Sequence, residues 1–317
     1  MCDDRVGCIR SDAQGHADRA AAGDRGRAIG GARGRPDLPD PSDRNGRLIE
    51  DIIGTGLYCR LFDQAERVRW RLDDIAWDRI DRERVTPGLI ALVREIAFSE
   101  LTTTTATRRF LTELSDDVDF TQWIGVWFYE ETKHPQVLLR WLHQLGVTVS
   151  DDFIRRGRAT APFMKSRMGT FVTNIISEMV ASAAYSSLER NCPEPVLAGI
   201  ARNLAGDEAR HAATFYAYAQ RYLETSRDPD ADRRDALKVL FVWFQDNHHV
   251  KHPVNEFYGR NDARSEVGAT MDALGFSRAA PRERIFRLIG ELIGVPLDGT
   301  SDLVAALSTR GESHETT

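Results

Sequence analysis

The sequence has few cysteines, and their positions exclude the sites that cysteines most often build. The four cysteines stand at positions 2, 8, 59 and 192, and no two of them have Cys-x-x-Cys spacing. A zinc site built from paired thiolates and a disulfide framework are therefore not indicated. We expect reduced thiols.

Long apolar runs and nucleotide-binding motifs are also missing. No uninterrupted apolar stretch approaches the roughly 20 residues that a membrane span needs, and no charged-then-apolar secretory leader opens the chain. Neither a P-loop nor a G-x-G-x-x-G sequence occurs. With a net charge of only −6, we expect a soluble, cytoplasmic protein that binds neither nucleic acid nor membrane.

Aromatic residues are absent from the N-terminal part, where the first is Tyr58. Residues 1–46 are rich in Ala, Gly, Arg and Asp, and such a stretch cannot bury enough apolar surface to order itself. We predict a disordered tail over 1–46, one helical domain over 47–310 and a flexible C-terminal tail over 311–317.

Segments of alternating apolar and polar residues flanked by hairpin turns are not found after residue 47. Apolar residues recur instead at three- and four-residue spacing. The pattern predicts an all-α fold. Long helices are expected near 47–67, 86–114, 119–145, 164–190, 194–224 and 231–249, and shorter ones near 260–275, 281–293 and 300–309.

Two Glu-x-x-His pairs are the most informative feature that is present. Glu131 pairs with His134 and Glu208 with His211, a spacing that puts a carboxylate and an imidazole on one helical face. Either pair alone could be a chance match on a surface helix. However, Glu100 precedes the first pair by 31 positions, and a second such glutamate precedes the other pair by 30.

The glutamate that precedes the second pair is Glu178, so the pattern of Glu followed by Glu-x-x-His occurs twice. The second copy trails the first by 78, 77 and 77 residues for its three members. This near-constant offset indicates internal pseudo-symmetry between two pairs of helices.

All four acids fall in or beside apolar helical stripes, where an ionised carboxylate is costly unless it is paired or binds a metal. Two imidazoles cannot neutralise four acids, but two divalent cations could. A mixed oxygen and nitrogen donor set suits iron or manganese better than zinc or calcium, and the bundle favours iron.

EETKH at 130–134 and DEARH at 207–211 resemble the two signature motifs of the soluble acyl-carrier-protein desaturases, which are close to Glu-Glu-Asn-Arg-His and Asp-Glu-Lys-Arg-His. GTFVTNIISE at 169–178 and VKHPVNEFYG at 250–259 are also similar to segments of that family. The resemblance implies a ferritin-like four-helix bundle with additional helices. It also implies a diiron site with Glu100, Glu131, His134, Glu178, Glu208 and His211 as ligands.

The bridging ligands implied by the resemblance are Glu131 and Glu178, or their pseudo-symmetric counterparts. Glu130 and Asp207 each stand four residues before a ligand histidine and could orient its imidazole within a helix or across the bundle. Solvated acids beside the site are the alternative. Trp127, one turn before Glu131, could close the site or carry electrons, although core packing would also explain it.

The activity implied by the resemblance is reductive activation of O2 at the two irons, followed by hydrogen abstraction from an unactivated C–H bond of a carrier-bound acyl chain. An acyl carrier protein, a ferredoxin-like electron donor and a second copy of the chain in a homodimer are the implied partners. Acyl carrier proteins are acidic, so the basic segment Arg155, Arg156 and Arg158, with Lys165 and Arg167, is a candidate docking surface.

Two departures from the desaturase pattern lie beside the ligands. Ala181 stands three residues after Glu178, where the family typically has threonine, and Pro135 replaces a glycine and removes a helical donor to the carbonyl of Glu131. A kink is expected there. These changes leave open a hydroxylase that tailors a biosynthetic intermediate.

An N-oxygenase of the dimetal type is a further alternative, although Leu204 stands where that group has an additional histidine. A non-catalytic ferritin-like iron-binding protein is a minor one, because storage proteins of this fold are usually shorter and lack a long C-terminal helical extension. A purely structural bundle would leave four buried acids unexplained.

Overall fold

The computed structural model describes residues 56–159, 166–244, 252–262, 264–277, 279 and 281–309. Both tails predicted from the sequence, 1–46 and 311–317, lie outside these residues. Helices, short 3-10 turns and loops make up the described parts, which contain no strand. The all-α prediction is therefore confirmed.

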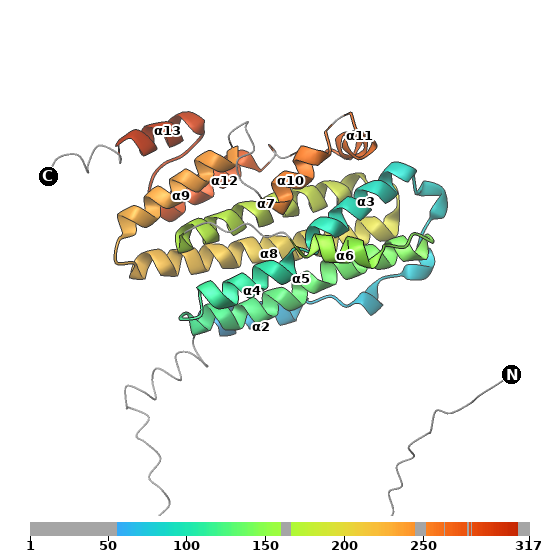
Figure 1. Ribbon diagram of the computed structural model, residues 1–317, viewed down its shortest axis with the longest axis horizontal. Helices are drawn as coiled ribbons and strands as arrows, with labels where there is room; N and C mark the ends of the chain where they lie inside the picture. The colour runs from blue at the N-terminus through green and yellow to red at the C-terminus, as the bar shows by residue number, and fades with distance from the viewer. Residues whose placement is uncertain are drawn as a thin grey trace, which may run out of the picture.

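The central bundle is built from long helices that lie side by side (Figure 1). Its members are α3 (Pro87–Glu100) with its continuation α4 (Thr103–Glu113), α5 (Val118–Gln144), α7 (Arg167–Asn191) and α8 (Pro195–Thr225). Helix α7 packs along α8, and α3 packs along α5.

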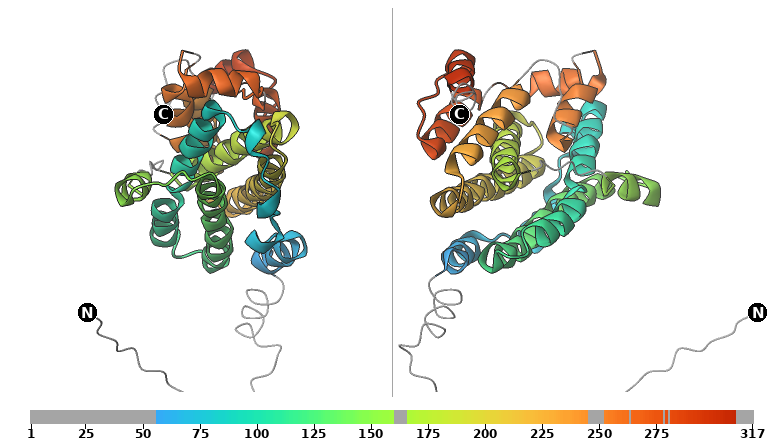
Figure 2. Two further views of the ribbon diagram at one scale, coloured as in Figure 1. Left: turned by 90° about the vertical axis from the view of Figure 1, so that its right-hand side faces the viewer. Right: turned by 60° about the vertical axis from the view of Figure 1, so that its left-hand side comes forward.

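The remaining elements surround this bundle. They are α2 (Leu57–Val68), 3-10 turns at Leu72–Asp74, Trp77–Arg79 and Arg82–Arg84, α6 (Asp151–Gly157), α9 (Pro229–Phe244), α10 (Pro253–Arg260), α11 (Glu266–Ala273), α12 (Arg282–Ile293) and α13 (Thr300–Thr309). Helices α9 to α13 cover one side of the bundle, whereas α6 projects away from it (Figure 2).

The expected helix over 86–114 is wrong at one point, because a two-residue turn at Leu101 and Thr102 divides it into α3 and α4. The hydroxyls of Thr102 and Thr103 donate to the carbonyls of Ser99 and Glu100, both at 2.9 Å. Such side-chain bonds compete with the helical ladder for backbone carbonyls and explain the interruption.

The expected helix over 260–275 is also wrong, because α10 starts earlier, at Pro253, and a loop separates it from α11. His252 caps α10, and Ser265 caps α11 by accepting from the backbone N–H of Gly268 at 2.9 Å.

The short helix α6 and the three 3-10 turns were not predicted. Helix α5 runs unbroken past Pro135. Residues 47–55, 164–165, 245–249 and 263 of the expected helices lie outside the described residues.

Two apolar clusters fill the interior. One is rich in aromatic rings and includes Phe110, Phe120, Trp127 and Phe215, and the other lies toward the opposite end of α5 and includes Leu138. On α5, Glu131 and His134 stand between the parts of the helix that enter the two clusters. A polar layer therefore separates the two apolar clusters.

Candidate metal centre

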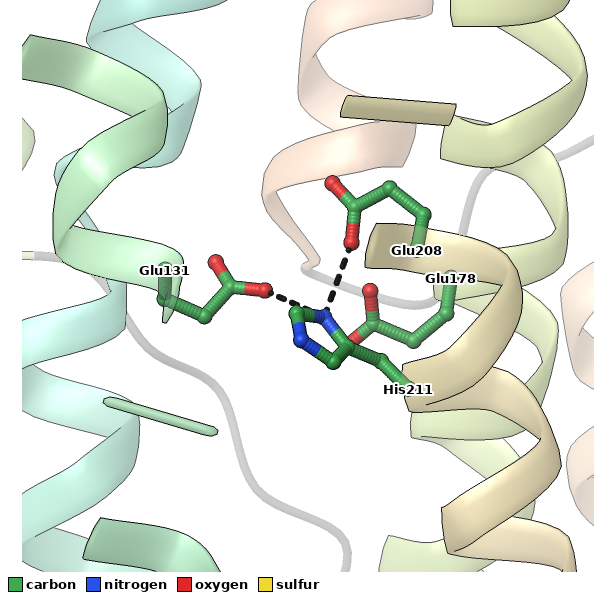
Figure 3. A group of neighbouring side chains, drawn as sticks. All are labelled: Glu131, Glu178, Glu208 and His211. Carbon is green, nitrogen blue, oxygen red and sulfur yellow. Dashed lines mark hydrogen bonds and ion pairs between the residues drawn. The ribbon is translucent and has the colours of Figure 1, made fainter. Parts of the chain in front are cut away.

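The bundle brings all six predicted ligands to this layer. Glu100 ends α3, Glu131 and His134 lie in the middle of α5, Glu178 lies in α7, and α8 supplies Glu208 and His211. Glu100 is the most accessible, with a side chain 13% exposed, and the other five are buried. Figure 3 shows four of the six converging from α5, α7 and α8.

His134 presents its Nδ1 atom to three carboxylates. This nitrogen lies 3.4 Å from Oε1 of Glu208, 3.6 Å from Oε2 of Glu100 and 3.8 Å from Oε2 of Glu131. Its geometry allows a hydrogen bond to none of them, although the atom is fully buried. An imidazole nitrogen placed in this way is suited to bind a cation that the carboxylates share.

His211 presents the same atom from the other side. Its Nδ1 lies 3.0 Å from Oε1 of Glu131 and 3.2 Å from Oε2 of Glu208. Glu131 and Glu208 thus approach both imidazoles, each with one oxygen toward either ring. Glu131 and Glu208 are therefore the two carboxylates that both imidazoles share.

The separations fit a shared metal. Oxygen and nitrogen ligands bind divalent ions at about 2.1 Å, so neighbouring ligands of one ion lie about 3 Å apart. Among the described residues, two groups of side chains bring their ligand atoms within 4.8 Å of one another, close enough to move onto one ion: Glu131, Glu178, Glu208 and His211 form one, and Glu100, Glu131 and His134 form the other. Glu131 belongs to both. The donor set therefore fits two adjacent metal ions.

The outer nitrogens of the two rings are held across the bundle. Nε2 of His134, on α5, lies 3.2 Å from Oδ2 of Asp207 on α8, and Nε2 of His211 lies 3.1 Å from Oε2 of Glu130 on α5. Arg210 forms ion pairs with both acids. Because each carboxylate accepts the Nε2–H proton, Nδ1 is left as the atom that faces the centre.

The cluster retains protons when it holds no metal. Burial, together with the charge of Glu208, raises the pKa of Glu131 to about 7 and that of Glu178 well above its usual range. Burial opposes ionisation of Glu208 too, but the neighbouring imidazolium charges hold its pKa low. Burial by itself would favour the neutral form of both histidines, yet the surrounding carboxylates raise their pKa values well above 6.5.

Sequence reasoning missed a set of groups behind Asp207. The indole N–H of Trp70 donates to Oδ2 of Asp207 at 2.8 Å, and the buried ammonium of Lys133 lies 3.3 Å from the backbone oxygen of Trp70. The same ammonium lies 4.3 Å from the centre of the Trp70 ring. Trp70 precedes the bundle in sequence, so no spacing relates it to the ligands.

Two hydroxyls beside the carboxylates were also not predicted. Tyr185 donates to Oε1 of Glu100 at 2.5 Å, and the Thr103 hydroxyl, 2.9 Å from the carbonyl of Glu100, also lies 3.1 Å from Oε2 of Glu131. Thr103 stands three residues after Glu100, as Ala181 stands three after Glu178. The hydroxyl that position 181 lacks is therefore present at the pseudo-symmetric position.

A cavity of about 90 Å³ opens onto the cluster. Trp127 lines it with its ring 6.3 Å from that of His211, and Ala181 lines it from α7. His252, from the start of α10, also lines this cavity. It lies in the segment 250–259 that the desaturase resemblance singles out, but it has no helical spacing that marks it as a site residue.

Comparisons with known proteins identify a structural likeness. No family model and no curated protein matches the chain. A solved structure of an R2-like ligand-binding oxidase with an aerobically reconstituted metal cofactor after photoconversion is similar over 76% of this chain and 94% of its own, with 15% identity and a TM-score of 0.52. This likeness confirms the predicted ferritin-like bundle and does not confirm the desaturase family.

In the described parts of the chain, no helix has both the length and the apolar character needed to cross a membrane.

Proposed function

We propose that this protein is a dimetal, O2-dependent oxidoreductase that acts on an apolar substrate. The observation that carries the proposal is the pair of buried imidazoles whose Nδ1 atoms face a shared set of carboxylates at 3.0 to 3.8 Å. Among the described residues, no other group of histidine, cysteine and acidic side chains meets the condition for a metal site.

Iron is the proposed metal, because four carboxylates and two imidazoles are a donor set that iron accepts. When bound, a reduced iron pair would supply two electrons for the activation of O2. The chain's own residues would hold and orient this pair. Glu131 and Glu208, each close to both imidazoles, would be among its ligands, and Asp207 and Glu130 fix the rings of His134 and His211.

An apolar cavity of about 50 Å³ adjoins the metal cavity, and Ala181 lines both. Its other walls include Ile96, Val180 and Phe257. Apolar walls exclude water and favour an apolar group beside the metals. This lining supports a substrate whose reacting C–H bond belongs to a hydrocarbon part.

The reaction that we infer from the two motifs is desaturase-like hydrogen abstraction from a carrier-bound acyl chain. Arg155, Arg156 and Arg158 on or beside α6 are exposed and support docking of an acidic acyl carrier protein there. Lys165, part of the same predicted surface, lies outside the described residues. A ferredoxin-like donor, a homodimer and a cytoplasmic location belong to the same proposal.

Hydroxylation is the second candidate, and Ala181 favours it. Loss of the hydroxyl that desaturases typically carry at this position changes the hydrogen-bond donors around the metal pair. This change favours transfer of oxygen to the substrate in place of removal of a second hydrogen. N-oxygenation of an amine would use the same six ligands.

A single turnover tests the proposal and separates these outcomes. Iron-loaded, chemically reduced protein is mixed with O2 and a panel of acyl carrier proteins, and the acyl groups are measured by intact mass spectrometry. Loss of two hydrogens identifies a desaturase, and gain of one oxygen atom identifies an oxygenase. Iron uptake and O2 consumption with no product from any acyl carrier would contradict the carrier-bound substrate.

A further inference from the structure

The metal cavity is joined to the apolar cavity by common walls. Ser99, Glu100, Ala181 and Val254 line both. The apolar cavity lies among residues of α3, α7 and α10 and the loop that contains Phe276. A substrate that fills it would therefore extend from the metal cluster toward α10.

Most hydroxyl and amide side chains that line the metal cavity already donate to a nearby backbone carbonyl. The hydroxyl of Thr102 donates to the carbonyl of Ser99, that of Ser177 donates to the carbonyl of Asn174, and the amide of Asn174 donates to the carbonyl of Thr170. Two lining groups differ, because the hydroxyl oxygen of Ser99 and the indole nitrogen of Trp127 are buried and have no hydrogen-bond partner. An unpaired buried hydroxyl is unfavourable unless a ligand supplies the partner.

His252 is a further unusual group in this lining. Its Nδ1 accepts from the backbone N–H of Val254 at 3.3 Å and so caps α10. The acceptor role of Nδ1 leaves Nε2 as the nitrogen that carries the proton. Burial lowers the pKa of His252 to about 4, so the ring is a neutral donor near pH 7. The ring of Trp243 packs 5.2 Å away and restricts its orientation.

We propose that Ser99 and His252 are a pair of hydrogen-bond donors that hold one acceptor group of the substrate beside the metals. This inference rests on the proposed function and deepens it by naming a substrate class. The class is a carbonyl compound, such as an acyl or aminoacyl group, whose reacting carbon lies close to the carbonyl. The apolar cavity takes the hydrocarbon part on the other side.

The middle of a long acyl chain does not satisfy this arrangement. A methylene group offers no acceptor, so both donors would stay unpaired beside it. Size points in the same direction, since the two adjoining cavities measure about 90 Å³ and 50 Å³, which together come close to the roughly 150 Å³ at which an engineered cavity accommodates benzene. A compact hydrocarbon part fits better than an extended one.

Binding of two probes to the iron-loaded, reduced, anaerobic protein tests the pair. Benzamide carries a carbonyl on a compact ring, and toluene has a similar shape without an acceptor. Isothermal titration calorimetry with His252→Phe and Ser99→Ala should show benzamide bound about five- to tenfold more weakly, as expected for one lost hydrogen bond. Toluene should bind as it does to the unchanged protein. His252→Gln, which keeps an N–H donor, should bind benzamide within about twofold of the unchanged protein.

Three results would overturn the inference. Benzamide affinity could be unchanged in both donor-deleting variants, toluene affinity could fall as much as benzamide affinity, or neither probe could bind to protein with full iron content. Iron content is measured in every sample. A chain that takes up no iron defeats the proposed function itself, whereas a full iron pair with one of these three binding results defeats only the donor pair.

Discussion

Each histidine of the candidate metal centre is oriented by a carboxylate that comes from the opposite helix. His134 on α5 is held by Asp207 on α8, and His211 on α8 is held by Glu130 on α5. The arrangement repeats the pseudo-symmetry of the sequence. Because both carboxylates are buried, their contribution to metal binding should be large.

Asp207→Asn and Glu130→Gln should each lower iron affinity about 10- to 100-fold, the usual effect of removing a carboxylate that orders a metal-bound imidazole. Each amide keeps the size of the side chain and removes the charge that fixes the Nε2–H proton. Competition with a chromogenic chelator measures the affinity.

Glu189→Gln is the matched control for this pair of variants, since Glu189 forms an ion pair with the exposed Arg202 away from the metal cluster. It should leave iron affinity unchanged. An Asp207→Asn protein that retains the affinity of the unchanged protein would show that this carboxylate does not orient the ring.

The convergence of these six side chains could be predicted at this scale, because helical spacing and a repeated offset are properties of the sequence itself. The partners of Nε2 could not be decided, since spacing shows only neighbours on one helix and the bonds cross the bundle. Trp70, Tyr185 and His252 were missed as partners for a similar reason. Each approaches the site through tertiary packing that no local pattern encodes.

At the scale of single elements, the start of α8 fixes where Glu208 and His211 lie. Glu194 caps this helix, accepting from the backbone N–H groups of Val196 at 3.0 Å and Leu197 at 2.8 Å. The same fully buried carboxylate accepts the indole N–H of Trp141 on α5 at 2.9 Å. It therefore ties the two Glu-x-x-His helices together.

Glu194→Ala should lower the free energy of unfolding by about 3 kcal/mol, because it removes a cap and leaves the buried Trp141 N–H without its acceptor. Urea unfolding monitored by circular dichroism measures the change.

Glu189→Ala, which removes one surface ion pair, should change the unfolding free energy by about 0.5 kcal/mol or less. If both alanine variants unfolded at the same urea concentration as the unchanged protein, the cap at Glu194 would not stabilise the start of α8.

Helix positions were predicted well where apolar periodicity is long, as for α5, α7 and α8. The prediction failed at Leu101 and Thr102, because the periodicity continues across this turn while the threonine hydroxyls interrupt the backbone ladder. The short α6 was missed because seven residues are too few to show a helical period. Pro135 does not end α5, because the backbone hydrogen bonds of the neighbouring residues continue the helix past it.

For the molecule as a whole, the polar layer between two apolar clusters couples folding to protons and metal. The folded, metal-free chain keeps protons on Glu131, Glu178, His134 and His211 at pH values where the unfolded chain has released them, because all four pKa values are raised. The folded state then binds more protons than the unfolded state, so the unfolding free energy falls as pH rises.

The temperature at the midpoint of thermal unfolding of the metal-free protein should therefore decrease as the pH rises from about 6.5 to about 8. His252 has the opposite sign, since its lowered pKa adds stability as pH rises, and this effect is complete about one unit above pH 6.5, where the unfolded-state imidazole has lost its proton. Asp207 and Glu208, whose pKa values are lowered, change stability only in more acidic solution.

Iron should reverse this trend, since metal competes with protons for the same atoms and binds more tightly as pH rises. Differential scanning calorimetry with and without iron measures both curves. A metal-free protein that gains thermal stability from pH 6.5 to pH 8 would contradict the assigned proton occupancy.

The central claim is that the six side chains bind two metal ions, and iron stoichiometry tests it most directly. The protein is reconstituted with ferrous iron under anaerobic conditions, and loosely bound metal is removed. Elemental mass spectrometry then gives the number of irons per chain. Two irons per chain, with loss of tightly bound iron in Glu131→Ala and His211→Ala, is the predicted result. Well under two irons per chain, unchanged by either substitution, would contradict the account.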